Sequence, residues 1–284
     1  MGSQIAQQAA LHGVEVWLHD IDAARLERAM SSNRQWLERR VERGKLDTGQ
    51  AEAAARGVTP AAELAPAARD SAWAIEAVAE EASVKREVFA QLDAHLPAGA
   101  GIATNSSNIV VSRLASATGR AKLCCNMHFF HPVLVMDLCE VVRGPDTAAE
   151  TVERAVAWSR RMGRTPVVVE REIDGFIVNR VLGAASREAF TLLAEGVASV
   201  ADIDTAARTG LNWPMGPFQL ADFSGLDVVL GVRRDRLLRE GHAGDDHTVR
   251  ILQSLVDAGR LGRKSGRGFY DYAEDPPAAL PLPD

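Results

Sequence analysis

Short apolar segments alternate with longer segments of helical length from the N-terminus to Glu170. The apolar segments suit buried strands, and several of the longer segments stop at a glycine, the usual C-terminal cap of a helix. Strands are expected at residues 14–19, 72–79, 101–104 and 165–170, with two more inside residues 124–143. Helices are expected at residues 1–13, 23–43, 83–96 with Ser83 as N-cap, and 147–162. This alternation predicts an α/β fold with a doubly wound parallel sheet.

The pattern changes after Asp174 and Gly175, because only helical segments follow. They are expected at residues 176–194, 200–209, 226–240 and 247–258. We therefore expect an α/β domain over residues 1–172 and an all-α domain over residues 173–272. Residues 273–284 are rich in proline and are expected to be a disordered tail.

Residues 124–143 read as two apolar strands joined at His131 and Pro132, where the proline has no ladder hydrogen bond to lose. Such a hairpin carries His128 near the end of one strand and Glu140 on the next. A carboxylate on the far ring nitrogen of a histidine fixes its tautomer and raises its basicity, as a general base for an alcohol requires. The pair is a candidate catalytic dyad; the alternative is a half-buried strand histidine with an edge glutamate.

Polar residues stand at the expected carboxyl ends of four strands, where doubly wound sheets bind ligands. They are Asp20, Glu80, Ser107 and His128. Each has an alternative. Asp20 and Ser107 could cap the helices that follow them, and Glu80 could be a solvated charge in a loop.

The composition is that of an ordinary globular protein, with 46% hydrophobic and 25% charged residues in a chain of 284. The net charge of −6 argues against a nucleic-acid or membrane-surface partner. No apolar run approaches the roughly 20 residues of a membrane span. The three cysteines have no spacing that suggests a metal site or a disulfide framework, which fits a cytoplasmic protein.

The start of the chain resembles part of a dinucleotide-binding unit. Asp20 follows Gly2 by 18 positions, close to the spacing between a glycine-rich turn and the acidic residue that binds the ribose of NAD. The first strand and the first two glycines of that fingerprint do not precede Gly2, so the Rossmann-like sheet is expected to lack its first strand. An ordinary N-terminal helix packed on a sheet is the alternative.

Four groups of motifs follow one another along the chain: HFFHP at 128–132 with VMDLCEVV at 135–142, DGFIVNR at 174–180, GPF at 216–218 with LAD at 220–222, and GRKSGRGFY at 262–270. In this order they resemble the 3-hydroxyacyl-CoA dehydrogenase family, including its bacterial 3-hydroxybutyryl-CoA dehydrogenases. The resemblance implies that His128 takes the proton of the 3-hydroxyl during hydride transfer, supported by Glu140. It also implies that Ser107 and Asn179 hydrogen-bond the reacting oxygen.

The resemblance further implies an acyl-CoA substrate, of L configuration at C3, bound by Ser107, Asn179 and Arg43. For Arg43, a solvated helix end is the alternative. NAD is implied as the cofactor, with Asp20 on the adenosine ribose repelling the extra phosphate of NADP. The expected cofactor-binding residues are Gly2, Asp20, Glu80, Lys85, Ser107, His131 and Lys264. The helical domain is expected to form a homodimer, and no metal is expected.

Three departures from the family pattern stand out. His131 replaces the usual asparagine, Asn108 replaces the common leucine, and the first strand with its two glycines is absent. We expect the natural protein to be longer by roughly ten residues, which supply that strand. Two other functions stay open: a non-catalytic protein of this fold, like the lens crystallin relatives, and a dehydrogenase of a free hydroxy acid or sugar acid.

Overall fold

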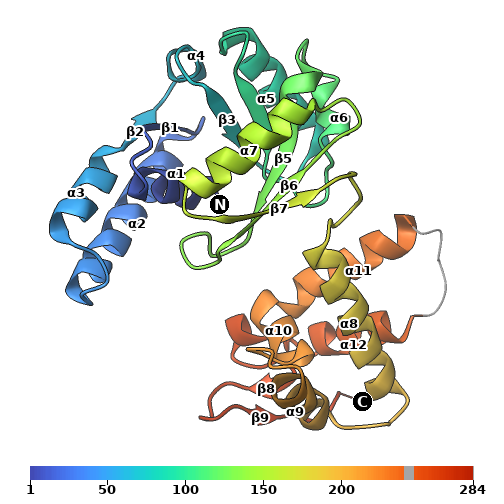
Figure 1. Ribbon diagram of the computed structural model, residues 1–284. Coiled ribbons are helices and arrows are strands. Elements are labelled where there is room, and N and C mark those ends of the chain that lie inside the picture. Colours follow the sequence, from blue (N-terminus) through green and yellow to red (C-terminus); the bar gives the residue numbers. More distant parts are fainter. Residues whose placement is uncertain (240–245, 284) are drawn as a thin grey trace. The chain divides into compact units, whose positions relative to one another are not determined.

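The computed structural model describes residues 1–239 and 246–283, so the expected helix end at Glu240 lies outside the described residues. The chain divides into two compact units, Met1–Ile177 and Val178–Asp284 (Figure 1). The first combines strands and helices and the second is mainly helical. The predicted fold class, a parallel-dominated α/β sheet followed by a helical domain, is confirmed.

Five strands of the first unit form one sheet in the order β3-β4-β5-β6-β7. These strands are β3 (Trp73–Glu76), β4 (Gly101–Thr104), β5 (Cys124–Phe129), β6 (Leu138–Val142) and β7 (Thr165–Val169). All neighbouring strands are parallel except β5 and β6, which form the predicted antiparallel hairpin. Their register sets His128 directly opposite Glu140.

Helices cover both faces of this sheet. They are α1 (Gly2–Leu11) and α7 (Ala149–Arg161) on one face, and α5 (Ala82–His95) and the short α6 (Ser112–Ala115) on the other. Ile5 and Ala155 pack with Met127 of β5, while Phe89 packs with Ile102 of β4. Successive strand residues point to opposite faces of the sheet. Because helices cover both faces, every residue of the central strands β4 and β5 is buried.

β1 (Val16–His19) and β2 (Val58–Ala61) form a separate parallel pair (Figure 1). In the part of the chain that the structure describes, no ladder joins β1 to β3. β1 and β3 are only partly buried, whereas β4 and β5 are buried along their whole length. Trp17 in β1 is 53% exposed. The expectation about residues upstream of Met1 stays a prediction.

The segment between α2 (Ala23–Glu42) and β3 contains elements that the sequence reading left out. They are α3 (Thr48–Arg56), β2 and α4 (Leu64–Ala68). The start of α3 is a capping box, in which Asp47 accepts from the backbone of Gln50 and the side chain of Gln50 accepts from the backbone of Asp47. The expected cap at Ser83 is wrong: Glu81 is the N-cap of α5, and the Ser83 hydroxyl, already inside the helix, donates to the Glu81 carboxylate.

The second unit contains α8 (Val178–Ala194), α9 (Val200–Gly210), α10 (Pro217–Ser224), α11 (Leu226–Arg239) and α12 (His247–Asp257). The sequence reading placed α10 in a loop, but Asp204 accepts hydrogen bonds from the backbone N–H groups of Phe218 and Gln219 and so caps this helix. The expected all-helical content is also incomplete. β8 (Tyr270–Asp271) pairs with β9 (Ala278–Ala279), and Leu280 N donates to Phe269 O, so part of the expected tail is ordered against the unit.

Gly268 in the second unit allows a loop to approach the buried carboxylate of Asp222. Asp222 accepts from Phe269 N and Tyr270 N at 2.9 and 3.0 Å. A Cβ on Gly268 would lie 1.9 Å from Asp222 Oδ1. Burial raises the pKa of Asp222, although these hydrogen bonds oppose the rise. The motif at residues 262–270 is therefore fixed by hydrogen bonds within the second unit, without the need for a ligand.

Candidate active site

The hairpin buries the His128 and Glu140 side chains against each other. His128 Nδ1 lies 2.8 Å from Glu140 Oε2; the imidazole is 10% exposed and the carboxylate is fully buried. A carboxylate at Nδ1 favours the tautomer that carries its proton there, which leaves the Nε2 lone pair as the basic site. Such a pair can accept a proton from an alcohol and stabilise the imidazolium that forms.

A second segment of the first unit packs on this pair. The other carboxylate oxygen of Glu140 accepts a hydrogen bond from Ile177 N at 3.0 Å, and the Phe176 ring packs edge-on against His128 at 5.7 Å. Phe176 has a positive φ of 46°, which is uncommon for a residue with a side chain. Strained backbone of this kind is concentrated at functional sites, and here it sets the ring and the Ile177 N–H against the dyad.

Ser107 lies in a turn that follows β4, beside the strand that carries His128. Asn105 Oδ1 in the same turn accepts from Phe129 N at 2.9 Å, one residue from His128. Ser107 O accepts from Gly175 N at 3.2 Å, so the turn also contacts the segment around Phe176. The Ser107 hydroxyl has no hydrogen-bond partner among the described residues, so it is available to a ligand.

Asn126, a buried polar residue that the sequence reading missed, fixes this turn. Asn126 of β5 is fully buried; its amide donates to Ser106 O and Ile109 O, and its carbonyl accepts from Val111 N. A lone polar residue between apolar ones in a strand was the available sequence signal for Asn126.

Asp20 stands at the end of β1, as predicted. The helix that follows is capped by Asp22, whose carboxylate accepts from Ala24 N and Arg25 N. Asp20 itself accepts only from Asp22 N through Oδ1, and its Oδ2 has no partner among the residues described. Asp20 is thus not the cap of α2, which leaves a carboxylate oxygen to bind a hydroxyl group.

The N-terminus of α1 lies beside the end of β3 and the turn of the hairpin. A Cβ on Gly2 would be 3.6 Å from Ala77 Cβ, and Gln4 Oε1 accepts from Val133 N at 2.8 Å. His131, in the same turn as Val133, is exposed. The first N–H groups of a helix have no partner within it and attract phosphate. With the Asp20 carboxylate, these groups fit the pyrophosphate and ribose of a dinucleotide.

The structure joins Glu80 and Lys85, two further residues that were predicted to bind the cofactor. Lys85 Nζ lies 3.2 Å from Glu80 Oε2, and the Glu80 side chain is 43% exposed. Lys85 itself is buried at 1% exposure. The pair therefore presents a carboxylate to solvent and an ammonium group to the protein interior.

The remaining predicted residues are Arg43 of the first unit and two residues of the second unit. Arg43 is exposed at the C-terminal end of α2. Asn179, in the first turn of α8, and Lys264 belong to the second unit, where Lys264 Nζ lies 2.5 Å from Asp227 Oδ1. Lys264 is about half exposed in this ion pair.

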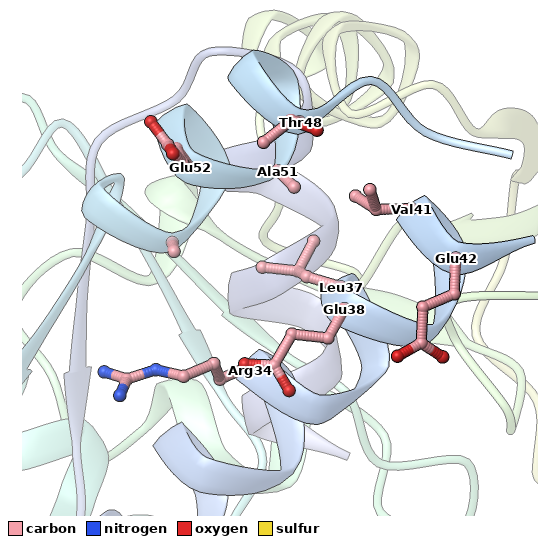
Figure 2. Close-up of a pocket in the computed structure, with 9 residues that line it drawn as sticks. Arg34, Leu37, Glu38, Val41, Glu42, Thr48, Ala51 and Glu52 are labelled. Carbon is pink, nitrogen blue, oxygen red and sulfur yellow. The ribbon is translucent and has the colours of Figure 1, made fainter. Parts of the chain in front are cut away.

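A groove of about 440 Å³ between α2 and α3 is not part of this site (Figure 2). Its floor is apolar, from Leu37, Val41 and Ala51, and its rim carries more carboxylates than cations. The groove contains none of the predicted site residues. Its acidic rim is unsuited to phosphate groups.

The three cysteines are buried free thiols. Burial raises the pKa of Cys139, the neighbour of Glu140, to about 12, and that of Cys124 to about 11. They remain protonated near neutral pH and do not act as nucleophiles. Among the described residues no helix is both long and apolar enough to cross a membrane.

Comparison with known proteins gives consistent matches over the whole chain. Residues 1–173 match the family model "3-hydroxyacyl-CoA dehydrogenase, NAD binding domain", and residues 175–272 match "3-hydroxyacyl-CoA dehydrogenase, C-terminal domain". A 3-hydroxybutyryl-CoA dehydrogenase of Bradyrhizobium diazoefficiens is 39% identical over 284 residues, which cover 100% of this chain and 94% of the relative. A probable 3-hydroxybutyryl-CoA dehydrogenase of Bacillus subtilis is 38% identical over 96% of this chain and 94% of its own length.

Solved structures agree with these matches. The crystal structure of a 3-hydroxybutyryl-CoA dehydrogenase from Escherichia coli has a TM-score of 0.90 at 38% identity, and the match covers 96% of this chain and 58% of that one. That of an (S)-3-hydroxybutyryl-CoA dehydrogenase from Ralstonia eutropha has a TM-score of 0.87 at 34% identity and covers 96% of both chains.

Proposed function

The chain belongs to the 3-hydroxyacyl-CoA dehydrogenase family, and we propose that it oxidises the 3-hydroxyl of (3S)-3-hydroxyacyl-CoA, with short-chain 3-hydroxybutyryl-CoA as a substrate, to the 3-oxo thioester. It is an NAD-dependent enzyme. The observation that carries the proposal is the buried contact of 2.8 Å between His128 Nδ1 and Glu140 Oε2. The names of the relatives support the substrate, and that of the Ralstonia eutropha enzyme supports the S configuration.

The reaction moves a hydride and a proton from the substrate to two different acceptors. Bound NAD supplies the acceptor for the hydride that leaves C3 of the substrate. His128 Nε2 takes the hydroxyl proton, and the C–O bond becomes a carbonyl. Glu140 holds the imidazole through Nδ1 and stabilises the positive charge that the imidazole acquires. In the reverse direction the imidazolium returns the proton to the oxygen.

The reacting oxygen changes from an alcohol to a carbonyl, so its partners must be able to donate hydrogen bonds. We assign this role to the Ser107 hydroxyl and the Asn179 amide. The unpartnered Ser107 hydroxyl in a turn beside His128 supports the first assignment. The second rests on the resemblance of residues 174–180 to the family motif.

Cofactor binding is assigned to residues on the first unit and one on the second. Asp20 binds the adenosine ribose through its free carboxylate oxygen and disfavours the extra phosphate of NADP. The N–H groups at Gly2 face the pyrophosphate. We further assign Glu80, His131 and Lys264 to the cofactor, and Lys85 through its ion pair with Glu80.

Arg43, exposed at the end of α2, is assigned to the phosphates of coenzyme A. The protein is proposed to be a homodimer that associates through its helical unit. Val181 of α8 and Val228 and Val232 of α11 are each more than half exposed, which supports a buried partner on these helices.

The substrate class is tested by comparing NADH oxidation with acetoacetyl-CoA and with free acetoacetate. We expect turnover with the thioester only, and in the forward direction with (S)- but not (R)-3-hydroxybutyryl-CoA. Turnover with free acetoacetate would identify a hydroxy-acid dehydrogenase. If NADH binds but neither compound reacts, the protein keeps the fold without this activity.

A further inference from the structure

Lys85 is a buried cation in α5 with three protein oxygen atoms around its ammonium group. Its Nζ lies 2.8 Å from Glu76 Oε1, 3.2 Å from Glu80 Oε2 and 3.4 Å from Val78 O. A lysine ammonium has three N–H donors, and three acceptors surround this one. A direct hydrogen bond to a cofactor would require one of these contacts to break, at the cost of a less well compensated buried charge.

Glu76, at the end of β3, connects this cation to the end of β4. Its Oε1 also accepts from Val78 N at 2.6 Å, and its Oε2 accepts from Thr104 Oγ1 at 2.7 Å. Thr104 Oγ1 in turn accepts from Ser106 N at 3.1 Å. Glu76 and Thr104 are both buried, so these hydrogen bonds form without competition from water.

Ser106 is the point at which the connections from Lys85 meet. Its N–H is held by Thr104, its hydroxyl donates to Glu80 Oε1 and accepts from Ile109 N at 2.8 Å, and its carbonyl accepts from Asn126. Every polar atom of Ser106 is therefore engaged, whereas the hydroxyl of the next residue, Ser107, is free of partners within the described chain.

We infer that Lys85 and Glu76 are positioning residues, which act through Thr104, Glu80 and Ser106 to fix the turn that presents Ser107. This inference rests on the proposed function, which assigns the Ser107 hydroxyl to the reacting oxygen. Lys85 holds the two carboxylates, Glu76 holds Thr104, and both arms end on Ser106, the residue that precedes Ser107. The Glu80 side chain is 43% exposed, so the network also orients the carboxylate that is assigned to the cofactor.

The test is a set of variants measured for both kcat and the Kd of NADH. Thr104→Val breaks the arm to Ser106 N and keeps the shape and all charges, and Lys85→Met removes the shared cation. We expect each to lower kcat roughly tenfold, because small misplacements of a reacting group are costly. The Kd of NADH should rise much less, and Lys85→Met should have no further effect on kcat in a Ser107→Ala background.

Thr151→Val is the matched control, since Thr151 is also buried and donates one hydrogen bond, to Lys122 O, in another part of the first unit. It should lose similar stability in urea and keep kcat. If Thr104→Val also keeps kcat, the network is only structural and the inference is wrong. A large rise in the Kd of NADH for Lys85→Met, with kcat unchanged at saturation, would place the role of Lys85 in cofactor binding and not in the position of Ser107, and the inference would be wrong.

The Ser107→Ala variant separates this inference from the function on which it rests. Should Ser107→Ala leave kcat unchanged, the assignment of Ser107 fails, and with it the network's role. If Ser107→Ala lowers kcat but Lys85→Met and Thr104→Val do not, the function stands and only the network is refuted.

Discussion

Replacing Glu140 with glutamine removes the charge beside His128 and leaves the shape of the side chain nearly unchanged. The two carboxylate oxygens accept from different donors, His128 Nδ1 and Ile177 N. An amide has only one acceptor oxygen, so it can keep one of these hydrogen bonds and must turn its NH₂ toward the other donor. The substitution therefore affects both the charge and the geometry of the dyad.

The size of the effect follows from these contacts. Two unit charges about 4 Å apart interact by roughly 4 kcal/mol at the effective dielectric constant of a protein. Since a polar amide replaces part of that stabilisation, we expect the barrier to rise by about 2–3 kcal/mol, which lowers kcat roughly 30- to 150-fold. Leaving one buried donor without an acceptor should lower the free energy of unfolding by about 1–3 kcal/mol.

The assay is the steady-state kcat of acetoacetyl-CoA reduction, followed by NADH absorbance, with urea unfolding alongside. Glu172→Gln is a suitable control, because Glu172 also accepts hydrogen bonds from a backbone N–H and a hydroxyl, both of Ser112. The Glu172→Gln variant should have a lower free energy of unfolding and an unchanged kcat. The reasoning is refuted if Glu140→Gln turns over at a rate close to that of the wild type while losing stability as Glu172→Gln does.

Further substitutions and one labelling experiment test other parts of the account. In the folded enzyme at pH 8, the three thiols should not react with a disulfide reagent, because they are buried and the pKa of Cys124 is about 11. All three should react in urea. Fast labelling of the folded protein would contradict this prediction. Gly268→Ala should lower the stability of the protein by about 1–3 kcal/mol or more, because the added Cβ would collide with Asp222. Gly231→Ala is the control and should be neutral or stabilising, because the space around its Cβ is open. Equal melting temperatures of the two variants would contradict the predicted collision. Lys264→Ala should weaken NADH binding and leave acyl-CoA affinity largely unchanged, and the reverse result would assign Lys264 to the substrate.

The sequence predicted the central hairpin well, because its two apolar strands and the proline between them leave few alternatives. Once the strands pair, the register that sets His128 opposite Glu140 follows from the positions of the buried residues. The positions of Asp20 after β1 and Ser107 in the turn after β4 were also predictable, because each follows an apolar run of strand length.

The network around Ser106 could not be predicted in the same way. Glu76, Thr104 and Asn126 are single polar residues in strands, far apart in the sequence, and no spacing connects them. The carboxylate of Glu80 looked like a ligand contact because it follows a strand, but whether Lys85 beside it turns inward depends on side-chain packing. The cap of α10 was missed for a similar reason, because Asp204 lies on another helix.

The most direct test of the central claim is single-turnover hydride transfer in a His128→Gln variant, saturated with NADH and mixed with acetoacetyl-CoA. The proposed role of His128 predicts a rate at least about a hundredfold below that of the wild type, as for the loss of a general acid, with little change in the Kd of NADH. A His128→Gln enzyme that transfers hydride at a rate near that of the wild type would contradict the assignment of His128 as the proton donor and acceptor.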